Sequence, residues 1–175
     1  MLDKTSTCCF TGHRHIPFDE YNALDQRLED EIEKLIRQGV RYFGAGGAQG
    51  FDTMAALAVL RLRILHPHIR LILVLPCKDQ AKRWDRANKK IYNLILRDAD
   101  KVVYVSRRYA SGCFQERNRR LVDHSGVCLC YLANPGSGTA YTAHYARQNG
   151  LRVVNLAVST PVCESDPPAR PAAGQ

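Results

Sequence analysis

Apolar and polar positions follow one another along the chain as short apolar runs separated by longer segments of mixed character. The continuous apolar run at 71–75 (LILVL) predicts a strand that is covered on both faces, as the strands of parallel sheets are. Residues 5–10 (TSTCCF), which are β-branched, aromatic and rich in cysteine, predict another buried strand, and 127–132 (VCLCYL) predicts a further strand. Similar short runs at 40–44, 101–105 and 151–156 predict three more strands.

The segments between these runs have the periodicity of helices. From Glu20 to Gln38 apolar side chains recur every three or four positions, and Gly39 is placed to end the helix. Residues 54–65 (MAALAVLRLRIL) predict a helix that is apolar on most sides. Further helices are predicted at 84–95, with a buried stripe that includes Ile91 and Leu94, at 115–124 and at 142–148.

Strands and helices therefore alternate throughout with short connections. This order predicts an α/β three-layer sandwich on a mostly parallel sheet with right-handed crossovers. We expect a single domain at 1–158. The segment 159–175 is rich in proline and has no periodicity, which predicts a disordered tail.

Composition and charge narrow the class of protein only slightly. The formal charge of +8 favours anionic partners. No apolar run approaches the roughly 18 residues of a membrane span, and the N-terminus has no signal-like apolar region, so a cytoplasmic protein without a membrane partner is expected. The seven cysteines form no C-x-x-C pair, which indicates buried free thiols rather than a metal site or a disulfide framework.

Two glycine-rich segments each join a predicted strand to a predicted helix, GAGGAQG at 44–50 and NPGSGT at 134–139. In an open parallel sheet ligands bind beyond the carboxyl ends of the strands, where both loops would lie. Glycine there allows backbone N–H groups to approach a phosphate closely, but a tight turn needs glycine equally. Thr139 adds a hydroxyl that would cap the helix or meet a phosphate.

Neither loop has a familiar nucleotide motif. G-K-[ST] is absent from both, which excludes a Walker-type phosphate loop, and the spacing of glycines at 44, 46, 47 and 50 does not match G-x-G-x-x-G. The strand at 71–75 also lacks a following acidic residue for a ribose hydroxyl, so a typical NAD dehydrogenase is not expected.

Polar side chains at the same sheet edge leave alternatives open. Asp52 either caps its helix or faces a ribose hydroxyl. His13 is either a hydrogen-bonded structural residue or a proton carrier, and Arg14 beside it is suited to holding an anion. Arg117 and Asn118 belong either to the site or to a solvated basic face.

Five stretches in order, CCFTGHR, GGAQGFDTMAA, LPCKDQAKRW, QERNRRLVD and GSGTAYTAHYA, resemble the YpsA-like branch of the SLOG superfamily, named for the SMF/DprA and LOG proteins. The resemblance spans about residues 5–156. It implies a Rossmann-like sheet with a nucleotide-type site at the carboxyl edge. It assigns ligand-binding roles to Gly12, His13, Arg14, Gly46, Gly47, Gly50, Asp52, Gln80, Trp84, Arg117, Asn118, Gly138 and Thr139, while Trp84 would equally suit the core.

The resemblance implies a domain that binds or senses a nucleotide or a derivative such as ADP-ribose or NAD. One alternative is a nucleotide N-glycosidic hydrolase related to LOG enzymes, but the catalytic glutamate that follows P-G-G-x-G-T in those enzymes has no counterpart after Thr139. Another is a DprA-like module for single-stranded DNA, with backbone contacts from the basic positions Lys82, Arg86, Lys89 and Lys90. Catalytic residues, the base of the ligand and the formation of a homo-oligomer are left open.

Overall fold

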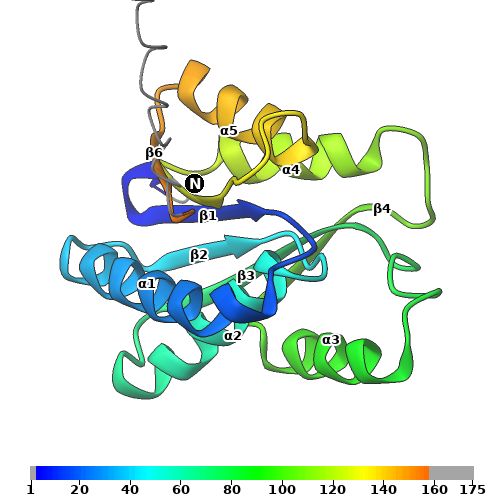
Figure 1. Cartoon of the computed structure of the whole chain (residues 1–175), viewed down its shortest axis with the longest axis horizontal. Coiled ribbons are helices and arrows are strands. Elements are labelled where there is room, and N and C mark those ends of the chain that lie inside the picture. Colours follow the sequence, from blue (N-terminus) through cyan, green and yellow to red (C-terminus); the bar gives the residue numbers. More distant parts are fainter. Residues whose placement is uncertain (1–2, 158–175) are drawn as a thin grey trace, which may run out of the picture.

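A computed structural model describes residues 3–157, which form one parallel six-stranded sheet (Figure 1). The strand order is β4-β3-β2-β1-β5-β6, and every neighbouring pair is parallel. The strands are β1 (Thr7–Gly12), β2 (Tyr42–Ala45), β3 (Arg70–Cys77), β4 (Lys101–Ser106), β5 (Val127–Tyr131) and β6 (Arg152–Asn155).

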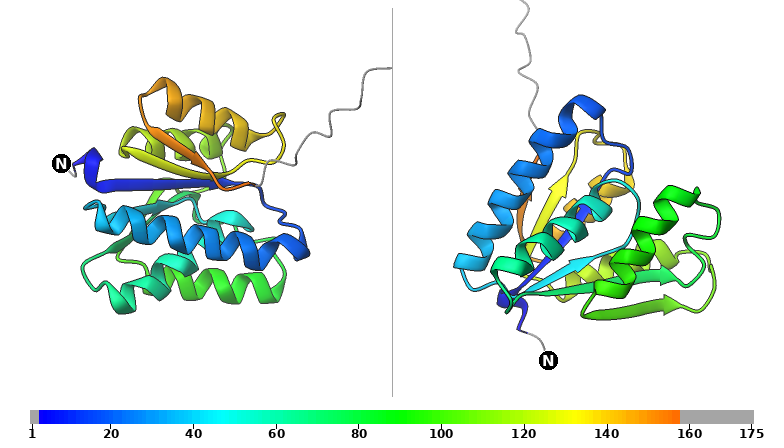
Figure 2. Two further views of the ribbon diagram at one scale, coloured as in Figure 1. Left: turned by 60° about the vertical axis from the view of Figure 1, so that its left-hand side comes forward. Right: turned by 90° about the horizontal axis from the view of Figure 1, so that it is seen from below.

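Helices cover both faces of the sheet (Figure 2). On one face lie α1 (Phe18–Arg37), α2 (Phe51–Leu65) and α3 (Arg86–Asp98), and on the other lie α4 (Cys113–Asp123) and α5 (Gly138–Gln148). A short 3₁₀ turn, Lys4–Ser6, precedes β1. The arrangement confirms the predicted α/β, Rossmann-like three-layer sandwich.

The core divides into two apolar layers because successive side chains of a strand point to opposite faces. In β1, Cys8 and Phe10 belong to the layer beneath α1, α2 and α3, whereas Cys9 belongs to the smaller layer beneath α4 and α5. The six cysteines of the described segment are free and buried, as the sequence predicted for those in strands.

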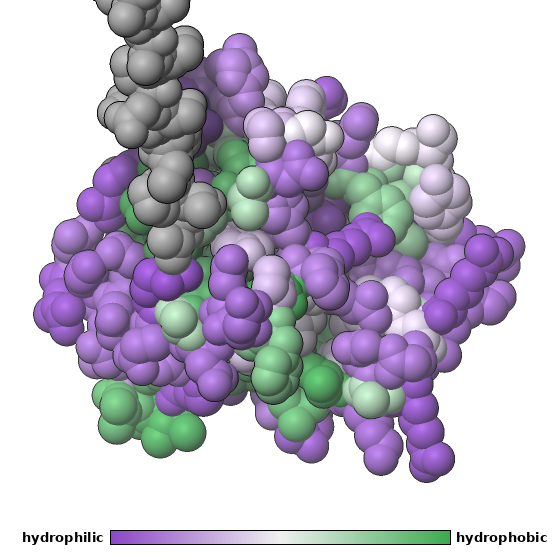
Figure 3. Space-filling model, in the orientation of Figure 1, coloured by the Kyte–Doolittle hydropathy of each residue, from purple (hydrophilic) through white to green (hydrophobic). Residues whose placement is uncertain are grey.

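Helix α3 differs from its prediction. Its buried residues are Tyr92 and Ile95, while Ile91 and Leu94, predicted to be buried, are 39% and 42% exposed. The helix lies at the edge of its layer. Fewer of its apolar side chains than predicted are therefore needed to cover the sheet. Separate hydrophobic patches lie along the lower edge of the molecule in Figure 3, and Ile64 and Leu65 at the end of α2 are 82% and 73% exposed.

Two further predictions concern membrane-spanning helices and the C-terminal segment. Among residues 3–157, no helix is long and apolar enough to cross a membrane. The predicted disordered tail at 159–175 lies outside the described residues.

The strand order creates a crevice between β1 and β5. The chain leaves β1 toward α1 on one face and leaves β5 toward α5 on the other, although the two strands are neighbours in the sheet. Loops diverge at such a switch point, and ligands of open α/β sheets bind there. The fold thus places the loops at 12–17 and 132–137 on either side of this opening.

Candidate functional site

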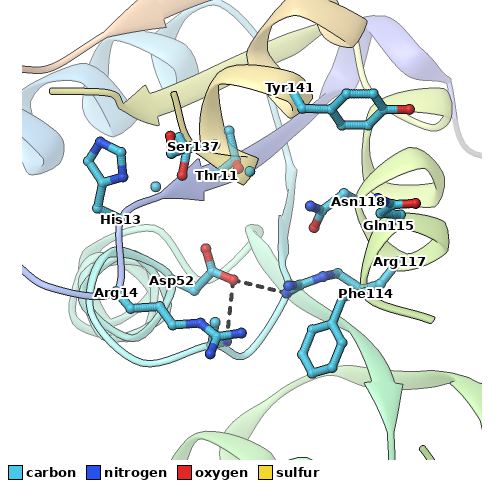
Figure 4. A pocket seen from close by; sticks show the side chains of 14 residues that line it. Thr11, His13, Arg14, Asp52, Phe114, Gln115, Arg117, Asn118, Ser137 and Tyr141 are labelled. Atoms are coloured by element: carbon cyan, nitrogen blue, oxygen red, sulfur yellow. Dashed lines mark hydrogen bonds and ion pairs between the residues drawn. The ribbon is translucent and has the colours of Figure 1, made fainter. Parts of the chain in front are cut away.

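The carboxyl ends of the strands and the first turns of α2, α4 and α5 enclose a cavity of about 410 Å³ (Figure 4). Residues from four separate parts of the chain therefore meet at the switch point. The cavity is lined by Thr11, Gly12, His13, Arg14, Ala48, Asp52, Phe114, Gln115, Arg117, Asn118, Ser137, Gly138, Thr139 and Tyr141.

An ion pair between Asp52 and Arg117 forms the deepest polar part of this cavity. Asp52 Oδ2 accepts hydrogen bonds from Arg117 Nη1 at 3.1 Å and from the Ala48 N–H at 3.3 Å. Both side chains are only 7% exposed. The other carboxylate oxygen, Oδ1, has no hydrogen-bond partner among residues 3–157 and points into the cavity (Figure 4).

Burial disfavours the charged form of each member of this pair. Burial raises the pKa of the Asp52 carboxyl, and the opposing effects of Arg117 and the Ala48 N–H are smaller. Burial also lowers the pKa of the Arg117 guanidinium, against the charge of Asp52. Arg117 Nε is buried without a partner in the described segment. A buried ion pair is weak evidence for a contribution to stability, and both members of this pair line the cavity.

A second guanidinium, that of Arg14, lies below the Asp52 carboxylate in Figure 4, while Arg117 approaches from the right. Its Cζ lies 5.6 Å from the centre of the Phe114 ring, and Arg117 Cζ lies 5.9 Å from the same centre. Arg14 is exposed, and its guanidinium has no hydrogen bond or ion pair within residues 3–157. The cavity therefore holds one paired cation and one that is available to an anion.

The N-terminus of α5 is open toward the cavity. Ser137 caps the helix by accepting from the Ala140 N–H at 3.3 Å. The N–H groups of Gly138 and Thr139 have no acceptor among the described residues. A Cβ added at Gly138 would meet no atom within 4 Å. This end of α5 thus offers two free donors and the positive end of the helix dipole to an anion.

The glycine loop at 44–50 has a different environment. A Cβ at Gly46 would overlap the Arg117 guanidinium, and one at Gly47 would overlap Leu75. Gly50 has a φ of 77°, and a Cβ there would overlap the backbone of Arg14. A side chain at any of these glycines would overlap another part of the protein. The loop therefore packs closely against its neighbours in the fold, including Arg117 of the ion pair and the backbone that follows β1.

His13 joins the loop after β1 to the loop after β5. Its Nε2 accepts from the N–H groups of Ala133 at 2.9 Å and Asn134 at 3.1 Å. Its ring packs edge-on against Tyr131, with centroids 5.7 Å apart. Burial lowers the pKa of His13. With Nε2 engaged as an acceptor, this nitrogen cannot take up a proton without breaking both bonds, which favours the structural interpretation of His13.

Gln80 and Trp84 lie beside the main cavity, not in it. With Arg14, Ala48 and Phe114 they line a smaller neighbouring hollow. Gln80 Nε2 donates to the Gly47 carbonyl at 2.8 Å. Trp84 packs edge-on against Tyr92, with centroids 5.2 Å apart, and contacts the core. Gln80 thus supports the 44–50 loop from outside, while Trp84 belongs to the edge of the core.

Helices α4 and α5 are joined above the cavity by polar contacts. Asn118 Nδ2 donates to Thr142 Oγ1 at 2.9 Å, and Arg119 Nη2 donates to the Tyr141 hydroxyl at 2.9 Å. Tyr145 donates to Asp123 at 3.0 Å. Because Asn118 bonds across the helices, it lines the cavity with an orientation fixed by α5.

Of the residues assigned from the sequence, the cavity brings together Gly12, His13, Arg14, Asp52, Arg117, Asn118, Gly138 and Thr139. Gly46, Gly47, Gly50, Gln80 and Trp84 do not line it. Sequence reasoning did not select Thr11, Ala48, Phe114 and Ser137, which do. Ser137 carried a usable signal, since serine just before a helix is a preferred N-cap.

Chemically, the cavity combines donors for an anion with one free carboxylate oxygen. The first turn of α5 contains no acidic residue, so the structure offers no counterpart there to the LOG glutamate. No group of three or more His, Cys, Asp or Glu side chains within 3–157 is arranged to hold a metal ion. Asp52 is the only carboxylate that lines the cavity in the described segment.

Among solved structures, the fold is similar to DNA processing protein A from Helicobacter pylori, with a TM-score of 0.63 and 20% identity over 87% of this chain. It is similar to DprA from Streptococcus pneumoniae, with a TM-score of 0.63 and 19% identity over 84% of this chain. The matches span 65% and 48% of those two proteins. At such identities the likeness concerns the fold alone.

Sequence relatives are closer. The chain is 31% identical to a UPF0398 protein of Halalkalibacterium halodurans over 86% of this chain and 79% of the relative. It is 31% identical to the uncharacterized SPbeta prophage-derived protein YoqJ of Bacillus subtilis, over 73% of this chain and 82% of the relative. The model of the YpsA family, described as the YspA SLOG family, matches residues 8–154. This match covers almost the whole sheet with its helices, and the chain therefore belongs to the YspA SLOG family.

Proposed function

We propose that the cavity binds a nucleotide or a nucleotide derivative such as ADP-ribose or NAD. In this proposal a phosphate lies at the N-terminus of α5, Arg14 neutralises its charge, and Asp52 Oδ1 accepts a hydrogen bond from a ribose hydroxyl. The observation that carries the proposal is that free N–H groups, a free guanidinium and a free carboxylate oxygen meet in one cavity.

The dimensions and the chemistry of the cavity support this class of ligand. Its volume of about 410 Å³ falls within the roughly 300–1,000 Å³ range of small-molecule sites. A simple anion would use the N–H groups of α5 and the Arg14 guanidinium. It would be repelled by the Asp52 carboxylate, because like charges repel. A ligand that carries both a phosphate and hydroxyl groups satisfies both halves of the site.

Calorimetry with ADP-ribose, NAD and nucleoside monophosphates tests the proposal, using two variants that spare the fold. Arg14→Gln removes the unpaired cation, and we expect affinity to fall about 10- to 100-fold, as the loss of a charged hydrogen bond implies. Gly138→Val places a branched side chain over the free N–H groups, in space that the protein leaves empty, and should abolish binding of the phosphate.

The control is Gly136→Ala in the same loop, where an added Cβ would be 3.7 Å from Asn134 Oδ1, an ordinary contact. It should bind as the unmodified chain does. Binding that survives in both Arg14→Gln and Gly138→Val would place the ligand elsewhere. Substitution of Gly47 is a poor test, because its Cβ would overlap Leu75 and disturb the fold whether or not a ligand binds.

A second candidate function is the binding of single-stranded DNA. DNA processing protein A from Helicobacter pylori binds single-stranded DNA, and in this chain the basic side chains of Lys82, Arg86 and Lys90 are exposed. Fluorescence anisotropy with a labelled oligonucleotide across salt concentrations tests it, because phosphate contacts make affinity fall steeply with salt. Loss of binding in the triple Lys82→Ala/Arg86→Ala/Lys90→Ala variant, but not in Gly138→Val, would favour this function over the first.

A further inference from the structure

We infer that His13 is a positioning residue that makes ligand binding in this cavity dependent on pH. Neutral His13 holds the loop that leads into α5, and protonated His13 releases it. The inference rests on the proposed function, because it concerns the same anion-binding end of α5.

The hydrogen bonds of His13 define its protonation state. Nε2 accepts from two backbone N–H groups, those of Ala133 and Asn134, at 2.9 and 3.1 Å. An imidazole nitrogen accepts only when it carries no proton, so the ring is neutral with its proton on Nδ1. The backbone N–H of His13 also donates to the Tyr131 carbonyl at 3.3 Å, which fixes the residue at the end of β5.

These contacts continue through the loop to α5. The Asn134 side chain accepts from the Gly136 N–H at 3.0 Å, and the Asn134 carbonyl accepts from the Ser137 hydroxyl at 3.0 Å. Ser137 in turn caps α5. The position of the free N–H groups of Gly138 and Thr139 therefore depends on where Asn134 is held, and His13 holds it.

Protonation would reverse the interaction. Both nitrogens of an imidazolium are donors, so an N–H on Nε2 would face two N–H groups and all three would lack acceptors. The loop would have to move away, and α5 would lose the support of its cap. Since the capped end of α5 forms one side of the cavity, affinity for an anion should fall when His13 becomes charged.

The charged groups that line the cavity with His13 are Arg14 on the same loop, Arg117 from α4 and Asp52 from α2. From β5 the ring contacts Tyr131, whose hydroxyl donates to Glu20 of α1 at 2.9 Å. Burial is the cause that lowers the pKa of His13. The release should therefore occur below about pH 6.5, the usual pKa of histidine.

Replacement of His13 by glutamine separates its hydrogen bonds to the loop from its protonation. In His13→Gln the side-chain amide oxygen reaches a position close to that of Nε2 and can accept from the same two N–H groups, but it does not titrate. We expect the affinity of the unmodified chain for ADP-ribose to fall about three- to tenfold between pH 8 and pH 5.5, because a pKa below 6.5 leaves about a tenth or more of the His13 rings neutral at pH 5.5. In His13→Gln the change in affinity between pH 8 and pH 5.5 should stay below about twofold.

ADP-ribose is chosen because its pyrophosphate has no phosphomonoester to titrate near pH 6. A ligand-free measurement keeps the result independent of the proposed function. The amide resonances of Ala133 and Asn134 are followed by NMR from pH 8 to pH 5, and in the unmodified chain they should shift with the titration of the His13 ring. In His13→Gln they should not shift over this range.

Equal pH dependence in the two proteins, or amide resonances that remain fixed while His13 titrates, would overturn the inference. Amide resonances that follow His13 in a chain that binds no ADP-ribose would support the role of His13 and count against the proposed ligand. The two ideas can therefore fail separately.

Discussion

The two glycine-rich loops of this protein look alike in sequence but have opposite environments. In the loop at 44–50, Gly46, Gly47 and Gly50 each lie where a side chain would overlap other parts of the protein. In the loop at 134–139, Gly138 faces open space, and the backbone N–H groups beside it are free. The first loop is closed by the protein, and the second is open to a ligand.

The difference shows that a glycine-rich strand-to-helix connection is not by itself a phosphate site. The N–H of Ala48 is already taken by Asp52, and the N–H of Phe51 donates to the His13 carbonyl at 3.1 Å. A phosphate at this end of α2 would also meet the carboxylate of Asp52. The first loop places this carboxylate in the cavity, while the second leaves the N–H groups of Gly138 and Thr139 without an acceptor among residues 3–157.

Gly50→Ala should have the largest effect on stability. An alanine at a φ of 77° is strained, and its Cβ would overlap the Arg14 and His13 carbonyl groups. We expect the free energy of unfolding to fall by about 4 kcal/mol or more, the sum of backbone strain and overpacking. Urea denaturation followed by circular dichroism measures this. A near-native midpoint would show that the closed loop adapts more easily than its contacts imply.

Asp52→Asn should have the next largest effect. It leaves the Arg117 charge buried without its partner, and loss of one member of a buried pair costs about 3 kcal/mol or more. Asp25→Asn is the control, because Asp25 pairs with Arg61 on the surface at 2.9 Å and should cost at most about 1 kcal/mol. If both variants lost equal stability in urea denaturation, burial of the Asp52 pair would have no special cost.

Gly138→Ala should have the smallest effect. The methyl group enters empty space at the first position of α5. The free energy of unfolding, measured by urea denaturation, should therefore change by less than about 0.5 kcal/mol. The same glycine-to-alanine change would then differ by several kcal/mol between the two loops. A large loss of stability here would remove the contrast between them.

Much of the fold was predictable because it depends on local patterns. Continuous apolar runs identified the buried strands, and the glycine after α1 marked its end, with a φ of 95° at Gly39. Helix α3 was predicted less well, since Ile91 and Leu94 fit a buried stripe by spacing but lie at the edge of a layer. Periodicity gives the face of a helix, not how much of that face the sheet covers.

The location of the cavity was predictable, but the contacts within it were not. The carboxyl-edge rule placed His13, Arg14, Asp52 and Arg117 at one edge of the sheet, and all four line the cavity. It did not indicate that Asp52 and Arg117, which are far apart in sequence, form a buried pair, or that His13 accepts from the opposite loop. Such contacts depend on how far the loops of different strands extend beyond the edge of the sheet. No local sequence pattern determines this.

The strand order also has a consequence for how the domain folds. β4 lies at one edge of the sheet, yet the next strand along the chain, β5, pairs with β1. The cavity therefore cannot form until the segment that contains α4 has crossed the sheet and β5 has docked, a non-local step that costs loop entropy. A ligand of this cavity would recognise only the completed sheet. Its binding would raise the midpoint of global unfolding and would not merely order the loops that contact it.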